Sequence, residues 1–109
     1  VGVREHVMKK YLRGRIWLYS QDPIGSRMVQ GAFGLPVPES RRLLQELRGH
    51  VLEAIASAHA NHVLVAAIEA FTLDALEFVV DAVEGLGFRL AVHPYGCRIM
   101  IKLVEQFAD

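Results

Sequence analysis

The sequence is poor in several residue types, and each scarcity excludes a class of protein. A single cysteine, Cys97, permits neither an intrachain disulfide nor a CxxC metal motif, and it fits a reducing compartment. Lys and Arg total 12 and so do Asp and Glu, so the bulk charge gives no sign of nucleic-acid binding. Apolar runs stay shorter than a membrane span, and the first residues lack the apolar segment of a signal peptide.

Constellations for catalysis and metal binding are also missing. The sequence has no recognisable acid–base pair and no phosphate-binding loop. His59 and His62 have HxxH spacing, but His93 lies a whole repeat away, so surface or capping roles are favoured over zinc binding. No acidic residue is placed to hold a histidine beside Cys97, which disfavours a nucleophile. We expect no enzyme activity, no metal and no cofactor.

What the chain has instead is an internal repeat. The six residues from Gly25, from Ala60 and from Gly96 resemble one another at offsets of 35 and 36. Three more glycines recur in the same phase, each 11 residues before one of these motifs: Gly14, Gly49 and Gly85. Such a period is typical of stacked helical units.

These markers divide the chain into a first repeat, 14–48, a second repeat, 49–84, and an incomplete third repeat, 85–109. Residues 1–13 are then the end of a preceding repeat. The 109 residues suit one domain, but the chain begins at valine and ends on an apolar helical pattern. We expect it to be part of a longer protein.

Each repeat is predicted to hold three helices. Gly14, Gly49 and Gly85 are expected to follow the C-terminus of a third helix, in the left-handed backbone conformation that glycine favours there. The predicted first helices are 15–21, 50–58 and 86–92, the second 24–34, 60–70 and 95–107, and the third 3–13, 38–48 and 73–83. Pro23 and Pro94 suit the start of a second helix, where a missing N–H costs nothing, and Thr72 is expected to cap a third helix. Strand signals are weak. The predicted fold class is all-α, a right-handed helical-repeat solenoid.

The second helix of each repeat has two faces. An apolar stripe at helical spacing is expected in the core, namely Met28, Val29, Ala32 and Phe33, then Val63, Leu64, Ala67 and Ile68, then Ile99, Met100, Leu103 and Val104. The opposite face carries a triplet at positions n, n+1 and n+4, namely Ser26, Arg27 and Gln30, then Asn61, His62 and Val65, then Cys97, Arg98 and Ile101. Stacked repeats would set these triplets in a row. Guanidinium and imidazole planes can stack on unpaired bases, while small polar and amide groups can bond base edges.

The repeats resemble those of the Pumilio-homology (PUF) family of RNA-binding proteins over nearly the whole chain. The resemblance rests on HPYGCRIM at 93–100, on GSRMVQ at 25–30, and on the runs 48–69 and 76–98. It implies a superhelix in which each repeat contacts one base of single-stranded RNA. It also implies that RNA runs antiparallel to the repeats.

The resemblance further implies a base code. Ser26 and Gln30 with Arg27 resemble an adenine reader. Asn61 with His62 resembles a uracil reader, and Cys97 with Arg98 a second adenine reader, so the implied core is 5′-AUA-3′. The sequence departs from the family where Val65 and Ile101 replace the usual glutamine and where Ala60 replaces a glycine. Because a bidentate amide contact contributes about 1–3 kcal/mol of base discrimination in the related DNA case, we expect relaxed specificity.

The family resemblance implies cytoplasmic regulation of mRNA through 3′ untranslated regions, with effectors of mRNA decay or translational repression as protein partners and no membrane. Two alternatives stay open, a helical-repeat scaffold for proteins and a divergent PUF-like protein that binds structured or ribosomal RNA without a code. Cys97 itself is interpreted as a base-edge contact, with inert packing as the alternative. Trp17 and Tyr19 are expected to pack in the core or between repeats rather than to form a stacking platform.

Overall fold

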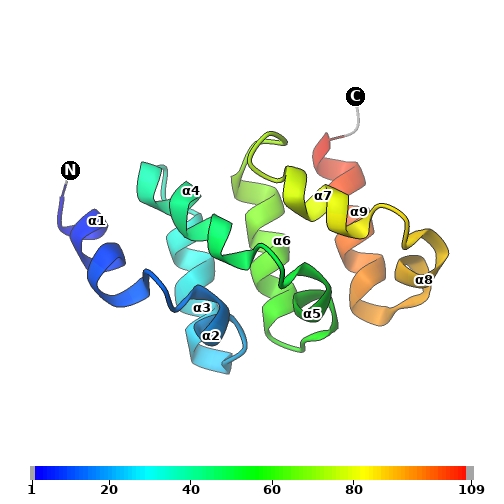
Figure 1. Cartoon of the computed structure of the whole chain (residues 1–109), viewed down its shortest axis with the longest axis horizontal. Coiled ribbons are helices and arrows are strands. Elements are labelled where there is room, and N and C mark those ends of the chain that lie inside the picture. The colour runs from blue at the N-terminus through cyan, green and yellow to red at the C-terminus, as the bar shows by residue number, and fades with distance from the viewer. Residues whose placement is uncertain (1, 108–109) are drawn as a thin grey trace.

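A computed structural model describes residues 2–107. At residues 87, 88 and 91 it describes the backbone alone. Residues 1 and 108–109, which the sequence assigned to the preceding repeat and to the third repeat, lie outside the described residues. The described residues form helices and turns, without strands, in a helical-repeat solenoid (Figure 1). The helices are α1 (Val3–Val7), α2 (Ile16–Ser20), α3 (Pro23–Phe33), α4 (Pro38–Leu44), α5 (Val51–Ala56), α6 (Ala60–Ala70), α7 (Glu77–Val83), α8 (Gly87–Val92) and α9 (Pro94–Phe107). A π-helical turn, Met8–Leu12, continues α1, and a 3-10 turn, Gln45–Leu47, continues α4. The predicted all-α class is confirmed.

The glycines between repeats have the predicted left-handed backbone. Gly14, Gly49 and Gly85 have φ angles of 82°, 83° and 91°, a region that side chains rarely adopt. Each glycine lies between the end of one repeat's third helix and the first helix of the next. The chain therefore reverses at the same place in every repeat.

The second helices α3, α6 and α9 begin beside a capping side chain at equivalent positions. The Asp22 carboxylate accepts from the backbone N–H groups of Ile24 and Gly25, at 2.9 and 2.7 Å. The hydroxyl of Ser57 accepts from Ala60 N–H at 3.1 Å, and Nδ1 of His93 accepts from the N–H groups of Tyr95 and Gly96 at 3.1 Å. These bonds satisfy N–H groups that lack a partner within the helix. The prolines were predicted, and the cap at His93 agrees with the surface or capping role expected for the histidines, but the recurrence of a cap in every repeat was not predicted.

The core runs between the second helices, which lie side by side in chain order (Figure 1). All four predicted core residues of α6, 63, 64, 67 and 68, are buried because α6 packs against both α3 and α9. The prediction was wrong for Met28, which is 48% exposed, and for Val104, which is 64% exposed. Each belongs to a helix that packs against only one other second helix among the described residues. Met100 and Leu103 are half-buried against the core.

The third helix of the second repeat begins later than predicted. Thr72 does not cap it through its side chain; its backbone carbonyl accepts from the N–H groups of Ala75 and Leu76 in a preceding turn. The helix α7 then starts at Glu77, with Leu76 at the N-cap. The corresponding α4 begins at Pro38, as predicted, because proline fixes the first helical φ there.

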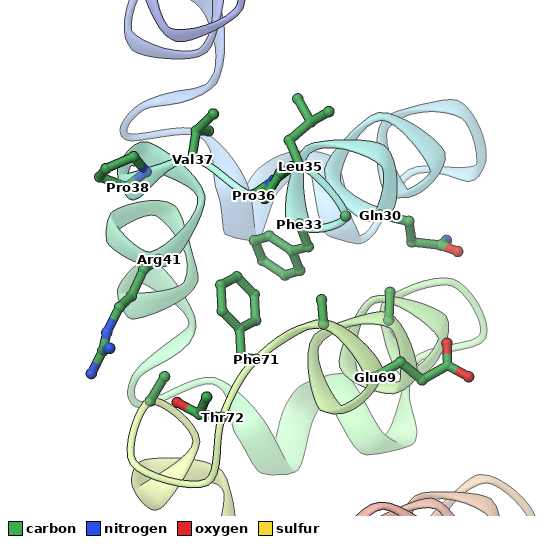
Figure 2. Close-up of a pocket in the computed structure, with 14 residues that line it drawn as sticks. Gln30, Phe33, Leu35, Pro36, Val37, Pro38, Arg41, Glu69, Phe71 and Thr72 are labelled. Atoms are coloured by element: carbon green, nitrogen blue, oxygen red, sulfur yellow. The ribbon is translucent and has the colours of Figure 1, made fainter. Parts of the chain in front are cut away.

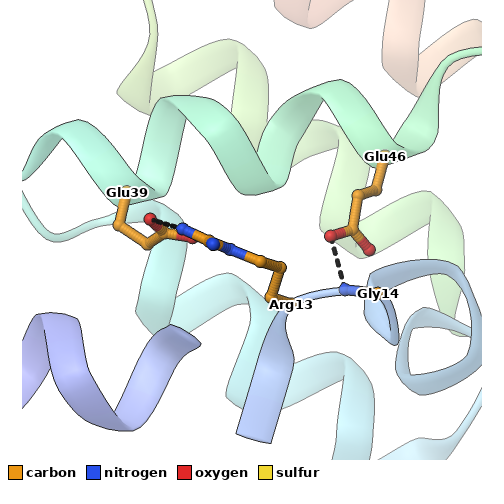
Figure 3. A network of polar contacts seen from close by, with 4 residues as sticks. All are labelled: Arg13, Gly14, Glu39 and Glu46. Atoms are coloured by element: carbon orange, nitrogen blue, oxygen red, sulfur yellow. Dashed lines mark hydrogen bonds and ion pairs between the residues drawn. The ribbon is translucent and has the colours of Figure 1, made fainter. Parts of the chain in front are cut away.

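Polar contacts join neighbouring segments of the array. Arg13 donates two hydrogen bonds to the carboxylate of Glu39, at 3.0 and 2.6 Å, and Glu39 is only 4% exposed (Figure 3). Glu46 accepts from the backbone N–H groups of Gly14 and Ile16, at 2.6 and 3.1 Å, so its carboxylate ties the end of the repeat to its first helix. The stack of Trp17 on His50, with ring centroids 4.6 Å apart, confirms that Trp17 packs between repeats.

The helices of the described residues are too short and too polar for any of them to cross a lipid bilayer.

Candidate nucleic-acid interface

The capped N-terminal turns of α3, α6 and α9 carry the three predicted triplets. Each triplet starts four residues after the capping side chain, so the cap fixes the backbone from which the triplet projects. Since neighbouring second helices pack against each other, the triplets follow one another along one side of the array. Their side chains nevertheless differ in what they present to solvent.

In the first triplet the small residue is hidden. Ser26 is 3% exposed, and its hydroxyl donates to the carbonyl of Pro23 at 3.3 Å. Arg27 is exposed and Gln30 is half-buried. Gln30 retains an amide, so it is the residue of this triplet that combines solvent access with both a donor and an acceptor for a base edge.

In the second triplet the asparagine is turned inward. Asn61 is 0% exposed, and its Nδ2 donates to the carbonyls of Ser57 and Ala58 at 2.6 and 3.1 Å. This differs from the expectation that the Asn61 amide faces a base. The physical reason is that a short amide in the first turn of a helix can bond carbonyls of the preceding turn. His62 is exposed, and Val65 is half-buried against the core.

In the third triplet the arginine reaches the previous repeat. Arg98 is exposed, and its Nη1 donates to Oδ1 of Asn61 at 3.3 Å. Cys97 is half-buried and has a free thiol, whereas Ile101 is 52% exposed without any hydrogen-bonding group. The structure therefore joins the second and third triplets directly.

The electrostatics of this face come from a few cations. Arg27 and Arg98 are exposed on it, and Lys102 lies next to Ile101 in the sequence. The pKa of Lys102 is raised, first by its hydrogen bond to Glu69 and then by the charge of that carboxylate, whose oxygen lies 3.1 Å from Nζ. The paired Lys102 adds little net positive charge, so the two arginines carry most of it. Over the described residues, no three potential metal-ligating side chains come together.

A separate hollow of about 720 Å³ lies beyond this row, at the C-terminal ends of α3 and α6. Figure 2 shows Phe33 and Phe71 at its centre, and their rings meet edge to face with centroids 5.4 Å apart. Gln30 and Glu69 lie at one rim of the hollow and Arg41 at another. Sequence reasoning missed this hollow, because Phe71 lies outside the helical periodicity of α6 and its partner is in another repeat.

Comparison with known proteins agrees with this geometry. No family model matches the chain. The chain is 32% identical, over 95 residues, to Pumilio homolog 1 of Xenopus laevis. It aligns over 99% of its length with the solved structure of the Puf3 RNA binding domain bound to Cox17 RNA 3′ UTR recognition sequence site B, with a TM-score of 0.90 and 27% identity.

The chain is an array of PUF repeats. A second structure of the Puf3 RNA binding domain, bound to Cox17 RNA 3′ UTR recognition sequence site A, matches all of the chain with a TM-score of 0.90 and 26% identity. The array is short beside these relatives. It spans 8% of the length of the Xenopus protein and 31% and 32% of the Puf3 chains.

Proposed function

We propose that this PUF array binds single-stranded RNA with base selectivity and serves as a binding module rather than an enzyme. The observation that carries the proposal is the row of exposed planar groups, Arg27, His62 and Arg98, at the same position of three neighbouring capped helices. Stacking on such groups contributes roughly 1–3 kcal/mol per base and tolerates any base. The Puf3 domains that share this fold are bound to RNA in their solved structures.

The proposed motif is 5′-AUA-3′, read from the third repeat to the first. Gln30 with Ser26 and Arg27 supports an adenine at the 3′ position, because Gln30 keeps an accessible amide. Cys97 and Arg98 support the 5′ adenine more weakly, since Ile101 offers no donor or acceptor. The middle base is the least specified.

We further propose that the RNA is mRNA, bound in 3′ untranslated regions in the cytoplasm, and that the bound protein recruits effectors of mRNA decay or translational repression. A protein scaffold is the second candidate. The hollow around Phe33 and Phe71 favours it, because a peptide could fill that space and meet the triplet row only at Gln30.

The test is fluorescence anisotropy of a labelled single-stranded RNA carrying AUA, against one in which the bases are permuted. The proteins are the wild type and the Val65→Gln/Ile101→Gln double variant, which restores the family's amides. We expect a preference for AUA that the double variant strengthens about tenfold, given about 1–3 kcal/mol for a bidentate amide contact.

A variant that lacks the planar row, Arg27→Ala/His62→Ala/Arg98→Ala, is the matched control and should bind neither RNA. All three side chains are exposed, so their loss spares the core. Absence of RNA binding by the wild type and by the double variant, with helical circular dichroism intact, would move the proposal to the protein scaffold.

A further inference from the structure

The contact between Asn61 and Arg98 crosses from the second repeat to the third. Asn61 projects from α6, whereas Arg98 projects from α9 one residue after Cys97. The guanidinium Nη1 donates to Oδ1 of Asn61 at 3.3 Å, although the two residues are 37 positions apart. At the junction between α3 and α6 the equivalent residues are Ser26 and His62, and the Ser26 hydroxyl bonds within its own turn, to Pro23.

The Asn61 side chain makes three of the four hydrogen bonds that it can form. An amide has two N–H donors and one carbonyl oxygen with two lone pairs. Both donors are matched by carbonyls of the preceding turn, those of Ser57 and Ala58, and the acceptor meets Arg98. The whole residue is 0% exposed, so neither a base edge nor water reaches it.

Turning this amide toward a base would be costly. It would break the two hydrogen bonds from Nδ2 to the carbonyls of Ser57 and Ala58, although the Ser57 carbonyl would still accept from the backbone N–H of Asn61. It would also remove the acceptor that holds Arg98. A uracil edge contact could replace at most part of these bonds.

The geometry assigns Asn61 a role other than reading a base. We infer that Asn61 is a positioning residue, which orients the guanidinium plane of Arg98 for stacking between the bases bound by the second and third repeats. The inference rests on the proposed RNA binding and refines it. It follows that the middle base is held by stacking on His62 and Arg98 and is not discriminated.

The first test is a base panel at the middle position. Four labelled RNAs, with U, A, C or G between two adenines, are titrated with wild type, Asn61→Ala, Arg98→Ala and Arg98→Lys. We expect the wild type to bind the four within about threefold, because stacking tolerates every base. Asn61→Ala and Arg98→Ala should each weaken all four to a similar extent, by about five- to tenfold, and Arg98→Lys, which keeps the charge but not the plane, should resemble Arg98→Ala.

The second test is a double-mutant cycle with a matched control. Asn61→Ala combined with Arg98→Ala should bind no more weakly than Arg98→Ala alone, because the asparagine acts through the arginine. Asn61→Ala combined with Arg27→Ala should show the product of the two single losses, since Arg27 occupies the equivalent place on α3, in the first repeat, on the other side of α6. A merely structural role of Asn61 would give the same product in both pairs.

The outcomes separate this inference from the function beneath it. A wild-type preference for uracil of tenfold or more that Asn61→Ala abolishes, with adenines still required at the flanks, would overturn the inference and leave RNA binding standing. Independent losses in the Asn61–Arg98 pair would overturn it too. Binding of no RNA by any variant would reject the proposed function and the inference with it. Since Arg98 is exposed, its variants keep the base panel informative even where Asn61→Ala unfolds.

Discussion

The first and second helices of a repeat approach each other so closely that one position favours glycine, which has no side chain. A Cβ atom on Gly25 would lie 2.5 Å from the carbonyl oxygen of Tyr19, and one on Gly96 would lie 2.6 Å from that of Leu90. The second repeat has Ala60 at the same place, fully buried, and its second helix begins at that residue, later than in the other repeats. Glycine therefore permits the short turn between the first and second helices, and Ala60 is accommodated by a longer turn between α5 and α6.

A pair of glycines on α3 tests this close approach. Gly25→Ala should destabilise the protein by about 1–3 kcal/mol, because backbone rather than a flexible side chain opposes the new Cβ. Gly31→Ala is the matched control, since nothing lies within 4 Å of its Cβ position. It should stabilise the helix by about 0.5–1 kcal/mol. Chemical denaturation of both variants gives the comparison, and equal effects of the same sign would contradict it.

The buried carboxylate of Glu39 makes stability depend on pH. The hydrogen bonds from Arg13, and then its charge, hold the pKa of Glu39 below its ordinary range against the opposing effect of burial. A depressed pKa contributes stability above the unfolded-state pKa of about 4.3, and that stability is lost as the pH falls through the lower folded-state value.

We expect Glu39→Gln to lower the free energy of unfolding by about 1–3 kcal/mol at pH 7 because Arg13 loses its charged partner. The difference from wild type should shrink as the pH falls from the unfolded-state pKa of about 4.3 toward the lower folded-state pKa, where the wild-type carboxyl becomes protonated. Urea denaturation across this range measures it. The exposed Glu84→Gln serves as control, and a difference independent of pH would refute the role of the charge.

The helical elements show which features a sequence pattern determines. Predicted second helices agree with the structure within one residue at most ends, because prolines, glycines and an uninterrupted apolar period set their limits. The delayed start of α7 was not predicted, since Thr72 uses its backbone carbonyl rather than its side chain. Likewise, triplet spacing located Asn61 but not its orientation, which is set by bonds to the carbonyls of Ser57 and Ala58 and brings Oδ1 to Arg98 of another repeat.

One side-chain contact at the start of a first helix is present in the first repeat but has no counterpart in the second. The Glu46 carboxylate bonds backbone N–H groups at the start of α2, where the helix dipole favours negative charge. Ala82 stands at the equivalent position, three residues before the next left-handed glycine. It lines a hollow of about 500 Å³ together with Gly49 and Val51, the counterparts of the residues that Glu46 bonds.

Ala82→Glu should therefore place a carboxylate over the start of α5. We expect it to raise the free energy of unfolding by about 0.5–1 kcal/mol through new bonds to the backbone. Ala82→Gln has the same length without the charge and should gain less. Thermal melts of the two variants beside wild type decide the matter, and a glutamate variant no more stable than the glutamine variant would contradict the mechanism.

At the scale of the whole molecule, stability comes from repeats that cover one another's apolar faces. Ile68 and Phe33 are buried at the position that Val104 occupies in the third repeat, where it is 64% exposed. Around it, Leu73, Val80, Leu103 and Phe107 line a hollow of about 360 Å³. This surface is apolar, like the surfaces that are buried between neighbouring repeats. Among the described residues no further second helix packs against it, whereas α9 packs against the equivalent surface of α6.

Residues 1–109 on their own should consequently self-associate through this surface. We expect the sedimentation coefficient to rise with protein concentration, and Val104→Lys to reduce the rise, because a charge in an apolar contact must give up its hydration. Val92→Lys is the matched control, since Val92 is 62% exposed but lies on α8, away from the hollow. If both variants and the wild type sediment as the same monomer at every concentration, the exposed end of the array does not attract a second copy.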